Sequence, residues 1–204
     1  MIITRISDYG LKISQGNTSI AVNPSGDKKQ LDNGTFTADI VLLSAPQIGF
    51  DSAEHFSKDD KTFVISSAGE YEVEELFIYG VTSTTVKDGQ SFNNTIYYFN
   101  LDGNDVCVLG AHEPLQLPGE ATELVDNIDI LIMPVTGEGV LSAVDANKIA
   151  TKLEANLVIP MGSSKESDNG IQAFKDEFGH DWVVSEKINP KNDKEAKPQA
   201  IFLQ

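Results

Sequence analysis

The side chains that could do acid–base or metal chemistry in this chain are few and widely spaced. The 204 residues contain three histidines: His55, His112 and His180. A zinc site needs several imidazole, thiolate or carboxylate donors at one point, and metal motifs often supply two histidines close together in sequence. No two of these histidines stand two residues apart, and none form a close pair on a helix. The chain therefore has no local metal-binding histidine motif.

Carboxylates offer a second kind of site. Asp51 and His55 are four residues apart in FDSAEHF, a spacing that would place both side chains on one face of a helix. We favour Asp51 as the N-cap of a short helical turn instead. Glu70 and Glu72 alternate along GEYEV and would point the same way in an extended segment. Paired carboxylates can divide into acid and base, although the neighbouring glycine and tyrosine favour a structural turn with a packed ring.

His112 is the histidine with the most chemical potential. It follows the strand-like run DVCVLGA and could act as a lone metal ligand or an acid–base group, while the alternative is a loop histidine with an ordinary hydrogen bond. His180 follows a glycine and is typical of a turn. Cys107 lies within the same run and is interpreted as a small buried hydrophobic residue. The sequence shows no nucleophile elbow, phosphate-binding loop or dinucleotide fingerprint.

The elements that would position these residues differ between the two halves of the chain. Short apolar runs separated by turn residues predict strands throughout the first half. The run ADIVLLS has no polar alternation between Ile40 and Leu43, which favours a strand covered on both faces. The predicted strands are residues 1–6, 9–14, 18–24, 38–44, 61–67, 75–84, 94–101 and 105–111.

The second half alternates between helical and strand patterns. Ser142 stands three residues before Asp145, an N-cap arrangement, and an apolar face follows it. The predicted helices are residues 119–128, 142–153 and 168–179, and the predicted strands are residues 129–136, 156–162, 181–186 and 199–204. Residues 187–198 are expected to form a charged loop. A β meander joined to such an alternation predicts one domain of two packed sheets with helices outside.

Composition narrows the classes of function. Net charge is −16, from 31 acidic and 15 basic residues, so attraction to a nucleic-acid backbone is disfavoured. No apolar run approaches the roughly 20 residues of a membrane span, and the N-terminus has no targeting pattern. The single cysteine excludes an intramolecular disulfide and suits a reducing compartment. We therefore expect an acidic, cytoplasmic protein without a membrane partner.

The order of segments resembles the metallo-β-lactamase fold, in its compact branch of predicted zinc-dependent hydrolases related to ascorbate-phosphate lactonase. The resemblance extends over residues 1–204 and rests on AVNPSG, ADIVLLS, SSAGEYEVEELFIYGV, DVCVLGA, IDILIMPVTG and NLVIPMG. It implies a single domain, residues 1–204, of the α+β or α/β class: a four-layer αββα sandwich of two packed sheets with outer helices.

The resemblance also implies where zinc ligands would stand, and those positions hold other residues. An aspartate that usually supports the site from an Asp-Pro pair is Asn23. The positions matching the family's ligands are Ala45, Gln47, Gly49, Phe50, Ala111 and Gly162. Alanine, glycine and phenylalanine have no donor, and a glutamine amide is a weak ligand for zinc. We therefore expect no metal cofactor, although zinc is expected of the family.

Two functions from different classes follow. The first is a pseudoenzyme: a metallo-β-lactamase-fold binding or structural module that has lost its metal motif and recognises a protein or small molecule. The alternative is a hydrolase with a relocated or single-metal site, in which His112, Asp51, Glu70 and Glu72 hold Mn²⁺ or Mg²⁺ or act without metal. A homo-oligomer, or pairing with an active homologue, is compatible with the first.

Overall fold

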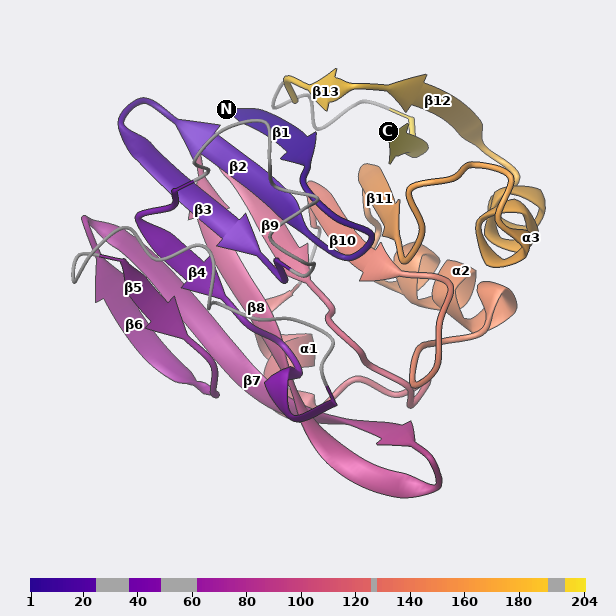
Figure 1. Ribbon diagram of the computed structural model, residues 1–204, viewed down its shortest axis with the longest axis horizontal. Helices are drawn as coiled ribbons and strands as arrows, with labels where there is room; N and C mark the ends of the chain where they lie inside the picture. Colours follow the sequence, from indigo (N-terminus) through magenta and orange to yellow (C-terminus); the bar gives the residue numbers. More distant parts are fainter. Residues whose placement is uncertain (25–36, 49–61, 126–127, 191–196) are drawn as a thin grey trace.

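Two mixed β-sheets packed face to face form the body of the molecule (Figure 1). The computed structural model describes residues 1–24, 37–48, 62–125, 128–190 and 197–204. The smaller sheet has the strand order β13-β1-β2-β3-β4-β5. Its strands are β1 (Ile2–Arg5), β2 (Leu11–Gln15), β3 (Thr18–Val22), β4 (Ile40–Leu42), β5 (Phe63–Ile65) and β13 (Lys187–Ile188). The predicted meander is β1 to β3, and β4 and β5 join it in parallel.

The larger sheet has the order β12-β14-β11-β10-β9-β8-β7-β6. The strands from β6 to β9 pair antiparallel, and those from β9 to β12 in this order pair parallel. The strands are β6 (Gly69–Val73), β7 (Leu76–Lys87), β8 (Gln90–Leu101), β9 (Asn104–Val108), β10 (Ile130–Pro134), β11 (Leu157–Met161), β12 (Asp181–Ser185) and β14 (Gln199–Leu203).

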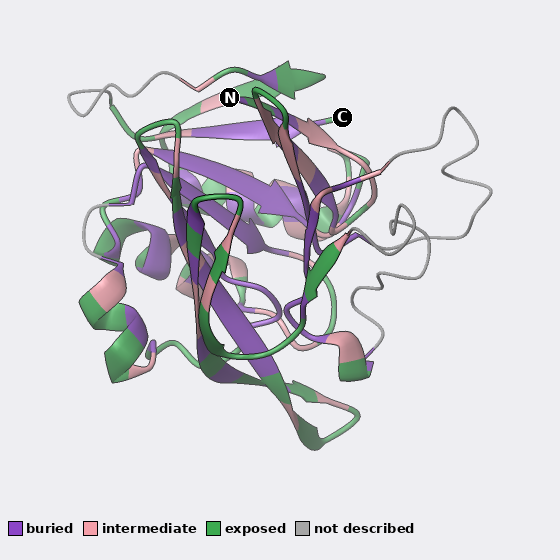
Figure 2. Ribbon diagram, turned by 90° about the vertical axis from the view of Figure 1, so that its left-hand side faces the viewer, coloured by how far each residue is buried: buried purple, intermediate pink, exposed green. Residues whose placement is uncertain are grey.

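The main hydrophobic core lies between the sheets (Figure 2). Ile13 and Ile40 from the smaller sheet meet Ile132 and Ile159 from the larger one in this core. All residues of β4, β10 and β11 are buried, which explains why their sequences lack polar alternation. Tyr97 of β8 is also buried, and its hydroxyl donates to backbone carbonyls at the ends of β4 and β5.

Three α-helices cover the outer face of the larger sheet: α1 (Gly119–Leu124), α2 (Ala143–Lys152) and α3 (Asn169–Phe178). Ser142 caps α2, because its side chain accepts from the amide of Asp145 as the sequence predicts. Asp168 caps α3 in the same way, and Gly179 ends it in the left-handed conformation. The predicted sandwich of two sheets with outer helices is confirmed. No described helix is long and apolar enough to cross a membrane.

Three elements differ from the sequence-based expectation. GEYEV forms edge strand β6 rather than a turn, because it pairs along its whole length with β7. Residues 187 and 188 form β13 at the start of the expected charged loop. The β7–β8 hairpin is longer than predicted and turns at Asp88 and Gly89, both with positive φ. The sequence pattern did not predict this extension because the residues at the hairpin tip are mostly polar. The tip covers little of the hydrophobic core and therefore needs few apolar residues.

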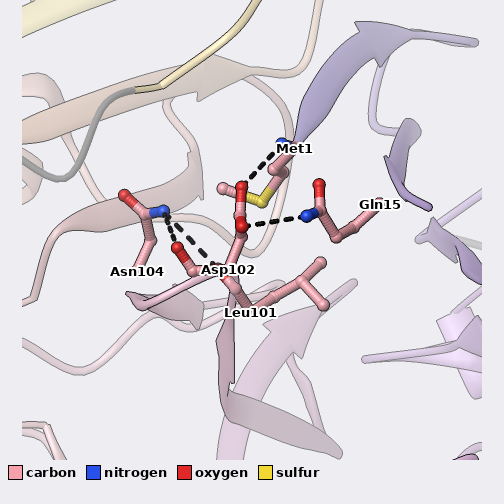
Figure 3. Close-up of polar contacts among 5 residues, drawn as sticks. All are labelled: Met1, Gln15, Leu101, Asp102 and Asn104. Carbon is pink, nitrogen blue, oxygen red and sulfur yellow. Dashed lines mark hydrogen bonds and ion pairs between the residues drawn. The ribbon is translucent and has the colours of Figure 1, made fainter.

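The N-terminus connects the two sheets (Figure 3). The α-amino group of Met1 contacts Oδ2 of Asp102 at 2.8 Å, and the Gln15 amide donates to Oδ1 at 2.8 Å. Asp102 belongs to the β8–β9 turn of the larger sheet, whereas Gln15 ends β2 of the smaller one. Arg5 forms a second connection, donating from β1 to the carbonyls of Leu203 and Pro160.

Candidate functional site

The loop after β4 is the frame of the candidate site, and it is held from two sides. The side chain of Asn23, at the end of β3, accepts from the amide of Ser44 at 2.9 Å. From the other sheet, the amide of Thr95 donates to the Ser44 carbonyl at 2.8 Å. Both Asn23 and Ser44 are buried. A neutral asparagine therefore fixes this loop with an ordinary hydrogen bond at the position of the family's aspartate.

An apolar plug fills the space beside this loop. It consists of the buried residues Ala45, Ile48 and Ala111, with Tyr9, Phe92 and Val140 packed against them. Ala45 and Ala111 both have no exposed surface. The structure thus brings together two positions that the resemblance assigns to metal ligands. Their methyl groups pack in one cluster with Ile48, which belongs to the short 3-10 helix at Pro46–Ile48.

Gly162, a third such position, lies at the end of β11 in a conformation that excludes a larger residue. Its φ is +118°, and a Cβ there would lie 2.4 Å from the carbonyl oxygen of Thr136. Its amide donates to the carbonyl of Asp8 at 2.8 Å, which holds the backbone in place. A histidine side chain at this position is incompatible with the observed backbone.

A small polar pocket opens next to the plug. Its volume is about 110 Å³, and the described side chains that line it are uncharged and, apart from Ala68, carry a hydroxyl or amide group. Gln47, the fourth described ligand position, is exposed and belongs to this pocket. The lining includes Ser44, Gln47, Ser66, Thr82, Asn93 and Thr95. Sequence reasoning missed this group, because its members come from four separate segments.

Two buried oxygen atoms near Gly110 have no hydrogen-bond partners among the described residues: Oγ of Ser44, which lines this pocket, and Oδ1 of Asn94. The amide nitrogen of Asn94 does have partners, donating to Ser83 Oγ at 2.7 Å and to the Leu109 carbonyl at 3.0 Å. Gly110 makes room for both oxygens. A Cβ there would meet Asn94 Oδ1 at 2.3 Å and Ser44 Oγ at 2.7 Å, and its φ is +65°.

His112 follows directly on the plug. Its side chain is 1% exposed, and neither ring nitrogen has a hydrogen-bond partner among the described residues. Burial lowers the pKa of His112 to about 4, with the backbone of Pro114 acting in the opposite direction. The ring is therefore neutral at pH 7. The sequence suggested a loop histidine with an ordinary hydrogen bond, and the structure has it in the loop after β9, buried, with the backbone of Pro114 as its nearby hydrogen-bonding group.

Glu70 and Glu72 lie away from His112. Both are exposed on edge strand β6, where they pair with Tyr79 and Phe77 of β7. The amide next to His112, that of Glu113, donates to the carbonyl of Thr84, five residues further along β7 than Tyr79. At about 3.4 Å per residue, this is a separation of roughly 17 Å. The structure does not bring these carboxylates to His112.

The remaining candidates do not add a ligand set. Asp51, His55, Gly49 and Phe50 lie outside the described residues. His180 is exposed and packs edge-on against the ring of Phe178. Among the described residues, no group of three or more His, Cys, Asp or Glu side chains is placed to hold a metal ion.

Zinc therefore does not fit the described part of the ligand set. The side chains of Ala45 and Ala111 have no donor atoms, and both belong to the buried apolar cluster that contains Ile48. Position 162 has no side chain and no space for one. The nearby oxygens of Ser44 and Asn94 are neutral, and zinc in proteins prefers thiolate, imidazole or carboxylate. Cys107, a donor elsewhere in the fold, is fully buried, and burial raises its pKa to about 12.

Comparison with known proteins places this geometry in a family. A family model described as the β-lactamase superfamily domain matches residues 4–162. A search of curated proteins found no match. Among solved structures, a predicted zinc-dependent hydrolase of the metallo-β-lactamase superfamily from Thermotoga maritima is 24% identical, with a TM-score of 0.76, covering 100% of this chain and 99% of that one.

Two further structures share the fold at lower identity. A predicted metal-dependent hydrolase from Parabacteroides distasonis is 20% identical, with a TM-score of 0.68 and coverage of 99% and 93%. A metallo-β-lactamase fold protein from Bacillus subtilis is 10% identical, with a TM-score of 0.66 and coverage of 100% and 96%. Because the family model spans well over half of the chain, this protein belongs to the β-lactamase superfamily domain family and has the metallo-β-lactamase fold.

Proposed function

We propose that this protein is a non-catalytic member of its family and a metal-free binding module. Its binding site would be the cleft at the family's metal positions, which we call the vacated cleft. The apolar plug is the observation that supports this proposal best. In a metal-dependent hydrolase the corresponding space must hold an ion and an activated water. Here Ala45, Ile48 and Ala111 are in contact and buried, so hydrophobic packing replaces the polar centre.

The small polar pocket is the part of the cleft that remains open. At about 110 Å³ it has room for roughly three or four waters, at about 30 Å³ each. Hydroxyl and amide groups both donate and accept, and none of the described residues that line the pocket is charged. This chemistry suits a small neutral polar molecule, or the neutral polar end of a larger one, better than an anion or a metal-bound substrate.

Metal binding is the first test. Untagged protein is incubated with Zn²⁺ or Mn²⁺, freed of unbound ion, and examined for metal content and thermal unfolding. A specific site at 100 times its Kd would stabilise the fold by about 2.7 kcal/mol, so it would be visible as a raised Tm. We expect no retained metal and no such rise. Near-stoichiometric metal in the parent protein would refute the proposal.

Ligand binding is the second test. Glycerol and acetate are titrated separately while the backbone amide signals of Gln47 and Thr95 are followed by NMR. We expect saturable shifts with glycerol and none with acetate. A Thr82→Trp variant, which fills the pocket from the exposed face of β7, should lose the glycerol response. A response to acetate alone would contradict a neutral-ligand pocket.

His112 supports a second candidate function, a hydrolase with a relocated site. Its two buried ring nitrogens have no partners among the described residues, and an imidazole in this state is available to a ligand or a proton. The discriminating variant is His112→Phe, which keeps a ring of similar size. Metal retention or hydrolysis that is present in the parent and lost in this variant would favour the second candidate over the first.

A further inference from the structure

Two cavities open at the end of the larger sheet opposite the vacated cleft. One has a volume of about 550 Å³ and the other about 290 Å³. Asp129 and Asn156, which precede β10 and β11, line both cavities. Thr136, beside the vacated cleft, is seven residues beyond Asp129 on the far side of β10. At about 3.3 Å per residue the two regions are roughly 20 Å apart.

A buried carboxylate lines both cavities. Asp129 is 6% exposed. Its Oδ2 accepts from the amide of Asp105 at 2.9 Å, and its Oδ1 accepts from the Asn156 amide group at 3.3 Å. Neither bond brings a positive charge, and Asp129 forms no ion pair with a described residue. A buried carboxylate without a counter-charge is costly, and each oxygen can accept a further hydrogen bond.

The surroundings make this end more negative. Asp105 accepts from the hydroxyl of Tyr98 at 2.8 Å. Burial, together with Asp105 and Asp129, raises the pKa of Tyr98 to about 12. Glu154 lines the larger cavity, and none of its described lining residues is a lysine or an arginine. The electrostatic environment of the larger cavity therefore favours a cation.

The larger cavity also has an apolar wall. Phe178, Ala150 and Pro198 line it together with the two carboxylates. Its volume lies in the range of roughly 300–1,000 Å³ that is typical of small-molecule sites, which combine apolar walls with a few placed polar groups. An occupant that matches both features has a positive head and an apolar body.

We propose that the larger cavity binds a small organic cation, with its ammonium group at the carboxylate of Asp129 and its apolar part against Phe178. The ammonium supplies the counter-charge that the protein does not provide, and Glu154 adds attraction from the same wall. The site is separate from the vacated cleft, so it stands or fails independently of the function proposed above.

The experiment compares three probes of similar shape at pH 7: 2-phenylethylamine as the ammonium, 2-phenylethanol as its neutral analogue, and 3-phenylpropionate as an anion. Binding to the full chain is measured by calorimetry and by NMR. A hydrogen bond to a charged group corresponds to a difference of about tenfold or more in Kd. We expect the ammonium to bind at least about tenfold more tightly than the alcohol, and the carboxylate not to bind. Equal affinity for amine and alcohol, or no binding of the amine, would overturn the proposal.

Three variants at the cavity locate the binding, and a fourth on β6 is the control. Glu154→Gln should weaken the amine selectively, and Glu72→Gln, an equal charge change on β6, should leave its Kd unchanged. Thr151→Trp, on the exposed side of α2 at the cavity, should block all probes without touching Asp129. Asp129→Asn should abolish the preference for amine over alcohol. Because this last variant could unfold, the Thr151 and Glu154 variants decide on their own: unchanged amine binding in both would refute the site.

Discussion

His112 should make the stability of this protein depend on pH in a defined direction. The ring is buried without hydrogen-bond partners among the described residues, and its pKa is lowered to about 4. In the unfolded chain a histidine has a pKa of about 6.5. Between these values the unfolded state binds a proton that the folded state does not. Stability therefore falls as pH decreases from about 6.5 to about 4, and His112 contributes no such loss above pH 6.5.

The size of the effect follows from the same two values. At about 1.4 kcal/mol per pKa unit, the gap between an unfolded pKa near 6.5 and a folded pKa of about 4 amounts to about 3.5 kcal/mol. About 2 kcal/mol of this should be lost between pH 7.5 and pH 5. His112→Phe removes the titrating group and both unpartnered nitrogens. The variant should be as stable as the parent at pH 7.5 or slightly more stable.

The assay is urea denaturation of the parent and His112→Phe from pH 7.5 to pH 4.5, with the difference in unfolding free energy plotted against pH. The carboxylates titrate in both proteins, so the difference isolates His112. We expect the variant to gain about 2 kcal/mol over the parent by pH 5. His180→Gln, which changes an exposed histidine, is the control. A difference that stays constant with pH, or that grows in the parent's favour as pH falls, would refute the reasoning.

Three further changes test the connection between the sheets and the fold around the site. Asp102→Asn keeps a residue suited to positive φ but removes the charge beside the N-terminal amine, so unfolding in urea should show a loss of about 1 kcal/mol; Asp88→Asn, in another positive-φ turn, should lose less. Gly162→His should lose about 3 kcal/mol or more in the same assay and gain no stability from Zn²⁺. A raised Tm with zinc would contradict the finding that the Thr136 carbonyl leaves no space for a side chain at this position. Asn23→Ala removes the side-chain acceptor of the buried Ser44 amide and should cost about 1–3 kcal/mol; no loss would mean that the loop is held elsewhere.

The fold was largely predictable from the sequence because its signals are local. β4, β10 and β11 are uninterrupted apolar runs, and their burial on both faces requires that composition. The caps at Ser142 and Asp168 satisfy the first amides of their helices, which fixes where α2 and α3 begin. β6 and β13 were not predicted, since exposed polar edge strands depend on a partner strand rather than on their own pattern.

The candidate site was predictable only in part. The sequence alone establishes that Ala45, Ala111 and Gly162 cannot donate to a metal, because this follows from side-chain chemistry. The small polar pocket and the buried carboxylate of Asp129 gave no sequence signal, since their neighbours come from distant segments.

By itself, then, the sequence determined the order of the strands and helices and the lack of donors at the family's metal positions, because local patterns and side-chain chemistry decide both. Only the tertiary structure decided the packing at these positions: Ala45, Ile48 and Ala111 form one buried apolar cluster, and the Thr136 carbonyl lies against Gly162. It also decided that His112 is buried away from Glu70 and Glu72. Packing is a property of segments that meet in space, and no single segment of the chain contains that information.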